Sequence, residues 1–434
     1  MEPEHTLYAC CPKCFALYAP DDSLPKDRYP HLCTRRPAAS EEPCGASLVT
    51  PGSANGTFLP RKTFALQTMR AWLAQLLARP EIERALERSW SSARAGASGV
   101  WSDILESPIV QEFLGPDDST LYSVENHGEL HLAFSLNIDW FNPFGNKQAG
   151  KSFSVGGVYL ACLNLPSHMR YKPENIFLAG IIPGPREPTV DQMNYILEPL
   201  VNELLVLWRT GVHINRTALR KFGRTVRAAV IPVVCDLPAA RKVAGFASHS
   251  ADTHFCSFCL LSRSGISQIY DRVKWGFRSY HEHMVAAQKM RDATTLKDRR
   301  ALFAKSGVRW SELLRLPYFD PTRFTVIDAM HNLYLGEFKH HCSQVLGIDV
   351  RDQDKQPGAS KIPMHTPTQQ RQELQKAVKA IIEGSDRVLK TIRKGYLLAL
   401  AQLNAVSLPG TSFVKCDIVD ALVDWVRCIF SRVI

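Results

Sequence analysis

The sequence predicts an α/β fold built around one mixed sheet, and the order of its elements is the main evidence. Three strand-like runs follow one another with turn residues between them, at 131–139, 153–166 and 175–184. A helical run, a fourth strand ending on Asp236 and a short helix closing at Gly245 come next. The order β-β-β-α-β-α is that of a ribonuclease H-like core, in which a three-stranded meander is followed by a helical crossover to a parallel strand.

An N-cap residue and apolar residues at helical spacing predict the helix at 189–211. Thr189 is a good N-cap residue, and apolar residues recur at helical spacing after it, with Pro199 as a candidate kink. Residues 324–347 read as a short strand that turns into another helix, and Asp328 is well placed to cap that helix.

The segments around this core differ in composition, which predicts five parts. Residues 1–50 are rich in cysteine and form a zinc-ribbon-like unit, and residues 51–125 are helical, with one helix from Thr63 interrupted near Pro80. The core spans 126–260, a basic helical insertion spans 261–325, and a helical C-terminal region spans 326–434.

Composition restricts the class of protein. The 434 residues are 45% hydrophobic and 22% charged, as in soluble globular proteins. The 52 Lys and Arg residues outnumber the 42 Asp and Glu residues, so the net charge of +10 favours an anionic partner. An apolar leader is missing and no run approaches ~18 apolar residues, so we expect neither secretion nor a membrane span.

Two aspartates at strand ends are the candidate catalytic residues. Asp139 follows the first strand of the core and Asp236 the fourth, and in this order of elements the two strands lie side by side. We expect the carboxylates to lie within ~8 Å of each other, where they can hold two Mg²⁺ or Mn²⁺ ions for phosphodiester cleavage. Either aspartate alone is more simply a turn or cap residue.

Twelve cysteines without a leader peptide indicate thiols and metal ligands more than disulfides. Near the N-terminus, Cys11, Cys14, Cys33 and Cys44 have the spacing of a closed structural Zn²⁺ site, and His31 or Cys10 are alternative ligands. A second C-x-x-C pair, Cys256 and Cys259, follows Asp236 and predicts a structural zinc next to the fourth strand.

Three stretches together resemble a known family: LNIDWFNPFG, DLPAARKVAGF running to CSFC, and IDAMHNLYLG. They are similar to the transposases of CACTA (En/Spm-type) elements in their fungal form, and the leader YACCPKCFALYAP resembles the zinc-binding start of those proteins. The resemblance implies that Asp139 and Asp236 are the first two acids of a D-D-E metal site. It also implies that Cys256 and Cys259 bind zinc with a later histidine pair, shortly before the catalytic glutamate.

The downstream part of that pattern is not present in the chain. No His follows His365 and no Glu follows Glu383, so the chain is expected to be truncated before the third acid. Asp328 and Glu337 are weaker candidates for that acid, the first as a helix cap and the second as a solvated side chain. His249 and His254 could complete a local site with the C-x-x-C pair, and His331, His340 and His341 lie farther along.

The sequence therefore predicts a transposase-derived protein. We expect it to be nuclear, to bind double-stranded DNA such as transposon ends, and to form a homo-oligomer, without a membrane partner. Two aspartates alone fix a second ion poorly, so the expected behaviour is DNA binding without cleavage. The alternatives are a catalytically inactive DNA-binding remnant and a zinc-stabilised interaction protein.

Overall fold

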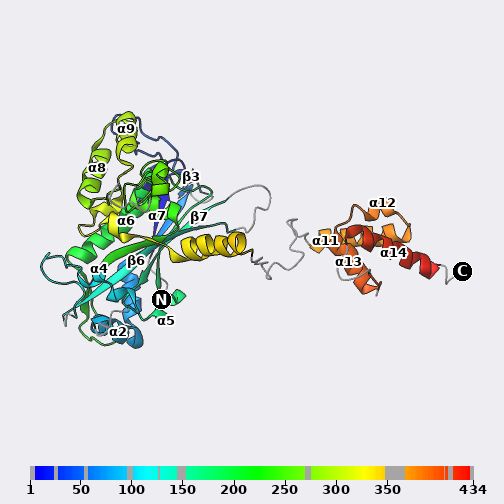
Figure 1. Cartoon of the computed structure of the whole chain (residues 1–434), viewed down its shortest axis with the longest axis horizontal. Coiled ribbons are helices and arrows are strands. Elements are labelled where there is room, and N and C mark those ends of the chain that lie inside the picture. The colour runs from blue at the N-terminus through cyan, green and yellow to red at the C-terminus, as the bar shows by residue number, and fades with distance from the viewer. Residues whose placement is uncertain are drawn as a thin grey trace. The chain divides into compact units, whose positions relative to one another are not determined.

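The computed structural model describes residues 5–23, 28–52, 57–94, 101–125, 128–143, 153–268, 275–347, 367–404, 406–408 and 414–430. The chain divides into two compact units, 1–350 and 351–434. The first unit contains a large curled sheet with helices packed against it, and the second is helical (Figure 1).

The strands of the large sheet are β1 (His5–Cys10), β2 (Leu17–Tyr18), β5 (Thr63–Gln67), β6 (Glu129–Phe141), β7 (Val155–Cys162), β8 (Ile176–Ile182), β9 (Val212–Ile214), β10 (Arg224–Cys235) and β11 (Thr325–Ile327). A separate pair consists of β3 (Val49–Pro51) and β4 (Phe58–Pro60). The longer helices of the first unit are α1 (Met69–Leu77), α2 (Pro80–Glu87), α6 (Val190–Arg209), α7 (Leu237–Ala244), α8 (Tyr280–Asp292) and α9 (Leu296–Ser306). Shorter turns of helix are α3 (Ser89–Arg94), α4 (Pro108–Gln111), α5 (Ser167–Arg170), α10 (Pro321–Phe324), η1 (Ile104–Glu106), η3 (Pro173–Asn175), η4 (Arg263–Gln268) and η5 (Glu312–Arg315).

The centre of the sheet follows the predicted order of elements. Strands β6, β7 and β8 form an antiparallel meander, α6 crosses over, and β10 returns parallel to β6. Strand β11 then adds parallel to β10, so the order across the sheet is β11-β10-β6-β7-β8. Helices α1, α2, α6 and α7 pack on these strands and bury one continuous apolar core.

A bulge in β10 sets the register at the carboxyl end of the sheet. Val230 pairs with Phe134, but the next pair is Val233 with Leu136, so β10 carries one residue more than β6 between these pairs. Pro232 lies in this interval and has no N–H to donate to a ladder, which is why a bulge suits it. This one-residue shift in register determines which residues of β6 and β10 are neighbours at the carboxyl ends of the two strands.

Helix α6 begins as its sequence predicts. Thr189 accepts from the backbone N–H of Gln192, and the Gln192 side chain accepts from the N–H of Thr189, so both halves of a capping box are present. Pro199 lies inside the helix, as expected, and the helix continues to Arg209.

The N-terminal part of the chain differs from the expectation. The predicted helix starting at Thr63 is wrong for its first residues, because Thr63–Gln67 alternate between exposed and buried positions and form β5. Strand β5 pairs with β8 and with β1, which belongs to the cysteine-rich segment. The cysteine-rich segment is therefore joined to the main sheet by strand pairing.

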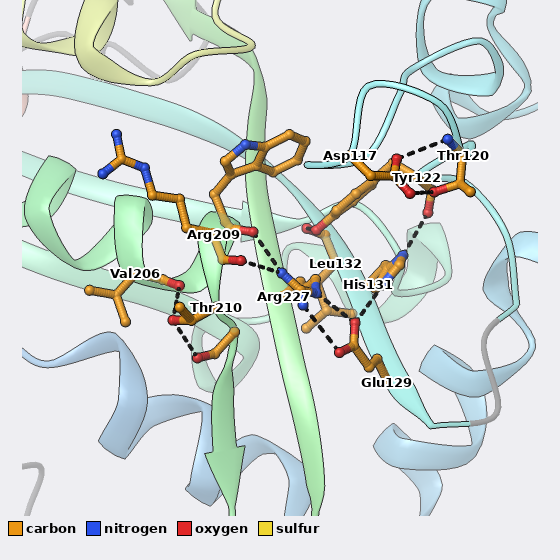
Figure 2. A network of polar contacts seen from close by, with 12 residues as sticks. Asp117, Thr120, Tyr122, Glu129, His131, Leu132, Val206, Arg209, Thr210 and Arg227 are labelled. Carbon is orange, nitrogen blue, oxygen red and sulfur yellow. Dashed lines mark hydrogen bonds and ion pairs between the residues drawn. The ribbon is translucent and has the colours of Figure 1, made fainter.

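A polar network fixes the amino-terminal end of β6 and β10 (Figure 2). Arg227 donates to Glu129 at 2.5 Å and to the carbonyls of Trp208 and Arg209 at the end of α6, both at 2.9 Å. The ring of His131 lies between Glu129 and the carbonyl of Tyr122, at 3.2 and 3.0 Å. Glu129 raises the pKa of Arg227, and Arg227 lowers the pKa of Glu129. Because the charges of Arg227 and Glu129 neutralise each other, we interpret this ion pair as structural.

The expected insertion is a hairpin of α8 and α9, which lie side by side near α6 in Figure 1. The cysteine-rich segment contacts this hairpin, since the backbone N–H and the hydroxyl of Ser40 donate to the carbonyl of Thr294 at 3.1 and 2.9 Å. After β11 the chain forms a largely π-helical segment, η6 (Met330–Phe338) and η7 (His341–Val345), drawn in yellow and projecting beyond the sheet in Figure 1.

The second unit has a core of its own. Its helices are α11 (Pro367–Ile382), α12 (Asp386–Leu389), α13 (Lys394–Leu403) and α14 (Lys415–Phe430). Leu397, Leu400 and Leu422 are among the side chains buried in it. Across the described part of the chain, none of the helices has the length and apolar character needed to cross a membrane.

Candidate metal and nucleic-acid site

Three aspartates lie at the carboxyl edge of three consecutive parallel strands. Leu136, Val233 and Thr325 are register partners on β6, β10 and β11. Asp139, Asp236 and Asp328 each stand three residues farther along the chain. Asp139 lies within β6, and Asp236 and Asp328 directly follow β10 and β11. Neighbouring strands lie about 4.8 Å apart, so three carboxylates in register span about 10 Å of the sheet edge.

Local hydrogen bonds orient the side chains of Asp236 and Asp328. Asp236 caps α7 by accepting from the backbone N–H of Ala239 at 2.7 Å. Asp328 accepts from the N–H of Met330 at 2.9 Å and contacts the ring of His331. The side chain of Asp328 is 16% exposed, so it is partly withdrawn from solvent but still accessible.

Neighbouring titratable groups respond to all three carboxylates together. Burial raises the pKa of the Cys235 thiol to about 12, and the charges of the three aspartates add to the rise. The contact with Asp328 raises the pKa of His331, and the charges of the other two aspartates act in the same direction. The three carboxylates thus form one negative region at the sheet edge.

Asp328 is one of the two candidates that the sequence offers for a third acid. As predicted, it caps the following helix, and Ile327, the residue before it, pairs with Cys235, the residue before Asp236. Glu337, the other candidate, is exposed on η6, which buries none of its side chains. The sequence makes Asp328 a weaker candidate because it is more simply a helix cap, and the pairing of β10 with β11 across the insertion leaves no local sequence signal.

The donor set fits hard divalent cations, which prefer carboxylate oxygens. Among the described residues, however, the three carboxylates are not gathered to the mutual 4.8 Å spacing that the cysteine cluster shows. An ion would have to draw the side chains together, and Asp328 would have to turn from His331.

An aromatic side chain and a lysine flank the acidic edge, and sequence reasoning missed both. The ring of Trp140, next to Asp139, lies against Gly156, where a Cβ would stand 2.5 Å from the indole. The ammonium of Lys242 on α7 lies 5.0 Å from the centre of this ring and pairs with Glu187 at 2.7 Å. A cation stacked on an aromatic ring stabilises the packing of α7 on β6 and β7 at this edge.

The four predicted N-terminal ligands do come together. Cys11, Cys14, Cys33 and Cys44 place their sulfurs within 4.8 Å of one another. Two of the separations are 3.7 Å, between Cys11 and Cys44, and 3.5 Å, between Cys14 and Cys33. Four sulfurs at ~2.3 Å from one zinc ion stand about 3.8 Å apart, so the cluster could hold a metal ion and its donors suit Zn²⁺.

Hydrogen bonds around the cluster favour thiolates at some positions. The contact with Cys14, together with backbone N–H groups, lowers the pKa of Cys11 to about 5. The same contact and burial raise the pKa of Cys14, and burial raises that of Cys33. Neither alternative ligand, Cys10 nor His31, belongs to the cluster.

The second C-x-x-C pair is only half of a metal site in the described part of the chain. Cys256 and Cys259 interact with each other, but a third ligand atom does not join them there. His254 instead interacts with the carbonyl of Lys305, and His249 lies beside a cavity at α7. The arrangement does not bring either histidine into a Cys₂His₂ cluster.

Comparison with known proteins supports one family. Residues 120–301 match the model of the Transposase family tnp2. The matched segment contains Asp139, Asp236 and the Cys256–Cys259 pair, and it ends within α9, before Asp328. A search of curated proteins found no match. The match supports a transposase family and, with it, DNA binding in general.

Proposed function

We propose that this chain is a transposase-derived protein of the CACTA (En/Spm-type) kind, in its fungal form, with a ribonuclease H-like core. Its substrate would be double-stranded DNA at transposon ends in the nucleus, bound by a homo-oligomer. The sheet order, the family match at 120–301 and the net charge of +10 support this proposal.

We propose further that Asp139, Asp236 and Asp328 are the carboxylates of a two-metal site for strand cleavage and transfer. The observation that carries this is the shared register of Leu136, Val233 and Thr325 on β6, β10 and β11, each of which stands three residues before one of the aspartates. Bound Mg²⁺ or Mn²⁺ ions would supply charge stabilisation to the attacking and leaving oxygens of phosphoryl transfer. The protein's part is to hold the ions at one edge of a rigid sheet.

A nicking assay on supercoiled plasmid tests this directly. With Mn²⁺ the chain should nick DNA, and Asp236→Asn or Asp328→Asn should each lower the rate by about a hundredfold or more, because replacing even an outer-shell partner of a metal ligand costs 10–100-fold. Glu337→Gln is the matched control, since it removes one exposed carboxylate from the helix that follows Asp328. Nicking that is unaffected by Asp328→Asn would remove Asp328 from the site.

A second candidate, a remnant that binds DNA without cutting it, is favoured by one specific observation. Both oxygens of Asp328 are engaged, one by the N–H of Met330 and the other by His331. If these contacts persist in the presence of metal, only two acids remain. The outcome would then be salt-sensitive DNA binding with no Mn²⁺-dependent nicking.

A further inference from the structure

A cavity of about 590 Å³ lies between the loop that carries the C-x-x-C pair and helices α8 and α9. The apolar part of its lining comes from Leu260, Val285, Leu302 and Val308. Figure 1 shows α8 and α9 together at one end of the first unit. The volume is within the range of pockets that enclose small organic ligands.

One polar side chain in this cavity lacks the partners that burial requires. His283 is 3% exposed, and neither of its ring nitrogens has a hydrogen-bond partner among the residues the structure describes. Burial and the nearby charge of Arg278 lower the pKa of His283 to about 4, so the ring is neutral at physiological pH. A neutral imidazole offers one donor and one acceptor, and leaving both unused in a protein interior is costly.

Three cationic side chains, called the rim below, also line the cavity. Arg278, Lys289 and Lys305 line it, with Glu282 as the opposing charge. Arg278 is held in place because its guanidinium donates to the carbonyls of Cys256 at 2.8 Å and His254 at 3.1 Å. The surroundings therefore combine an apolar interior, an unpaired imidazole and a positive rim.

The cavity shares one lining residue with a second cavity beside α7. His254 also lines a second cavity, of about 470 Å³, whose wall includes Arg241 and Lys242 of α7. Helix α7 begins immediately after Asp236, and Lys242 lies over the ring of Trp140. The α8–α9 cavity therefore shares one lining residue with a cavity beside the helix that follows Asp236.

We propose that the α8–α9 cavity holds one unpaired nucleotide of the DNA strand, with its phosphate at Arg278, Lys289 and Lys305 and its base against His283. This inference rests on the proposed function, because it takes DNA to be the substrate. An apolar pocket with one donor and one acceptor suits a base, whose faces are apolar and whose edge carries donors and acceptors. The cationic rim suits a phosphodiester.

The test uses the full chain and two DNA duplexes, one fully paired and one with a single unpaired 2-aminopurine. Anisotropy measures binding of both, and 2-aminopurine emission reports enclosure of the unpaired base. Lys289→Glu/Lys305→Glu changes the rim. Lys297→Glu/Arg300→Glu is the matched control, because it makes the same charge change on the same hairpin outside the cavity lining.

We expect the wild-type chain to bind the unpaired duplex roughly tenfold more tightly than the paired one. The rim variant should lose this preference, and the control variant should keep it. His283→Phe preserves ring volume but removes both nitrogens, and it should weaken the preference without changing binding of the paired duplex. If His283→Phe does not fold, the Lys289→Glu/Lys305→Glu variant alone still tests the inference.

Equal preference in the rim variant and the control would overturn the inference, as would unchanged 2-aminopurine emission on binding. These results are distinguishable from failure of the proposed function. If the chain binds and nicks DNA but shows no preference for the unpaired duplex, only the nucleotide-pocket inference is rejected. If the chain binds neither duplex, both the proposed function and the pocket inference are rejected.

Discussion

At the scale of single residues, the proposed two-metal site depends on Asp328. Its carboxylate caps a helix, contacts His331 and stands in register with two other aspartates. Asp139 and Asp236 were chosen as candidates from the sequence because each follows an apolar strand-like run, although β6 continues past Asp139 to Phe141. Asp328 also ends a strand, but that strand is three residues long, and nothing in the sequence reports which strand it joins.

The titration of His331 should report the state of Asp328. The contact with Asp328 raises the pKa of His331 above its ordinary value near 6.5. The pair therefore stabilises the fold below that pH, and this contribution is lost as the pH rises through the raised pKa. NMR of the full chain should show His331 titrating above 6.5, and the pKa of His331 should fall in Asp328→Asn.

Two further measurements test whether Asp328 raises the pKa of His331. Adding Mg²⁺ should lower the pKa of His331, because a cation at the carboxylates opposes the imidazolium charge. Glu337→Gln, the matched control, should leave the titration unchanged. A His331 pKa that does not respond to Asp328→Asn would show that the two side chains are not paired in solution.

At the scale of elements, the sequence predicted β6, β7, β8, α6, β10 and α7 because each carries a clear period between turn signals. It missed β5, whose five residues run directly into a helical pattern. It also missed that β1 pairs with β5, since strand pairing across distant segments leaves no local signal. The unpaired nitrogens of His283 are likewise invisible in sequence, because they depend on how α8 packs.

The cysteine cluster should control the edge of the sheet that it joins. Cys11→Ser/Cys14→Ser should remove about one zinc per chain and speed hydrogen exchange of β1 and β5, while the amides of β6 and β10 stay protected. Cys10→Ala is the control, because Cys10 is a buried neighbour outside the cluster and should retain zinc. Equal zinc content in both variants would show that these cysteines do not bind it.

At the scale of the whole molecule, two compact units with separate cores suggest separate unfolding. The core of the first unit includes Leu136 on β6, and the core of the second includes Leu397 on α13. Both side chains are fully buried, so truncation of either leaves a cavity. Composition alone could not predict the boundary between the two units. The predicted C-terminal region, 326–434, begins with η6 and η7, which belong to the first unit.

Leu397→Ala should destabilise the second unit by about 2–5 kcal/mol, the usual range for a buried leucine. Leu136→Ala should have a comparable effect on the first unit. Hydrogen exchange on the full chain distinguishes the two, because each variant should speed exchange in its own unit only. Exchange that rises equally in both units after either substitution would show one cooperative structure.

The most direct test of the three-aspartate site is anomalous diffraction from crystals of the full chain grown with Mn²⁺. The proposed function predicts two manganese peaks about 3.5–4 Å apart at the carboxyl edge of β6, β10 and β11, in contact with Asp139, Asp236 and Asp328. Crystals that contain no manganese at this edge, or a single ion held without Asp328, would contradict it.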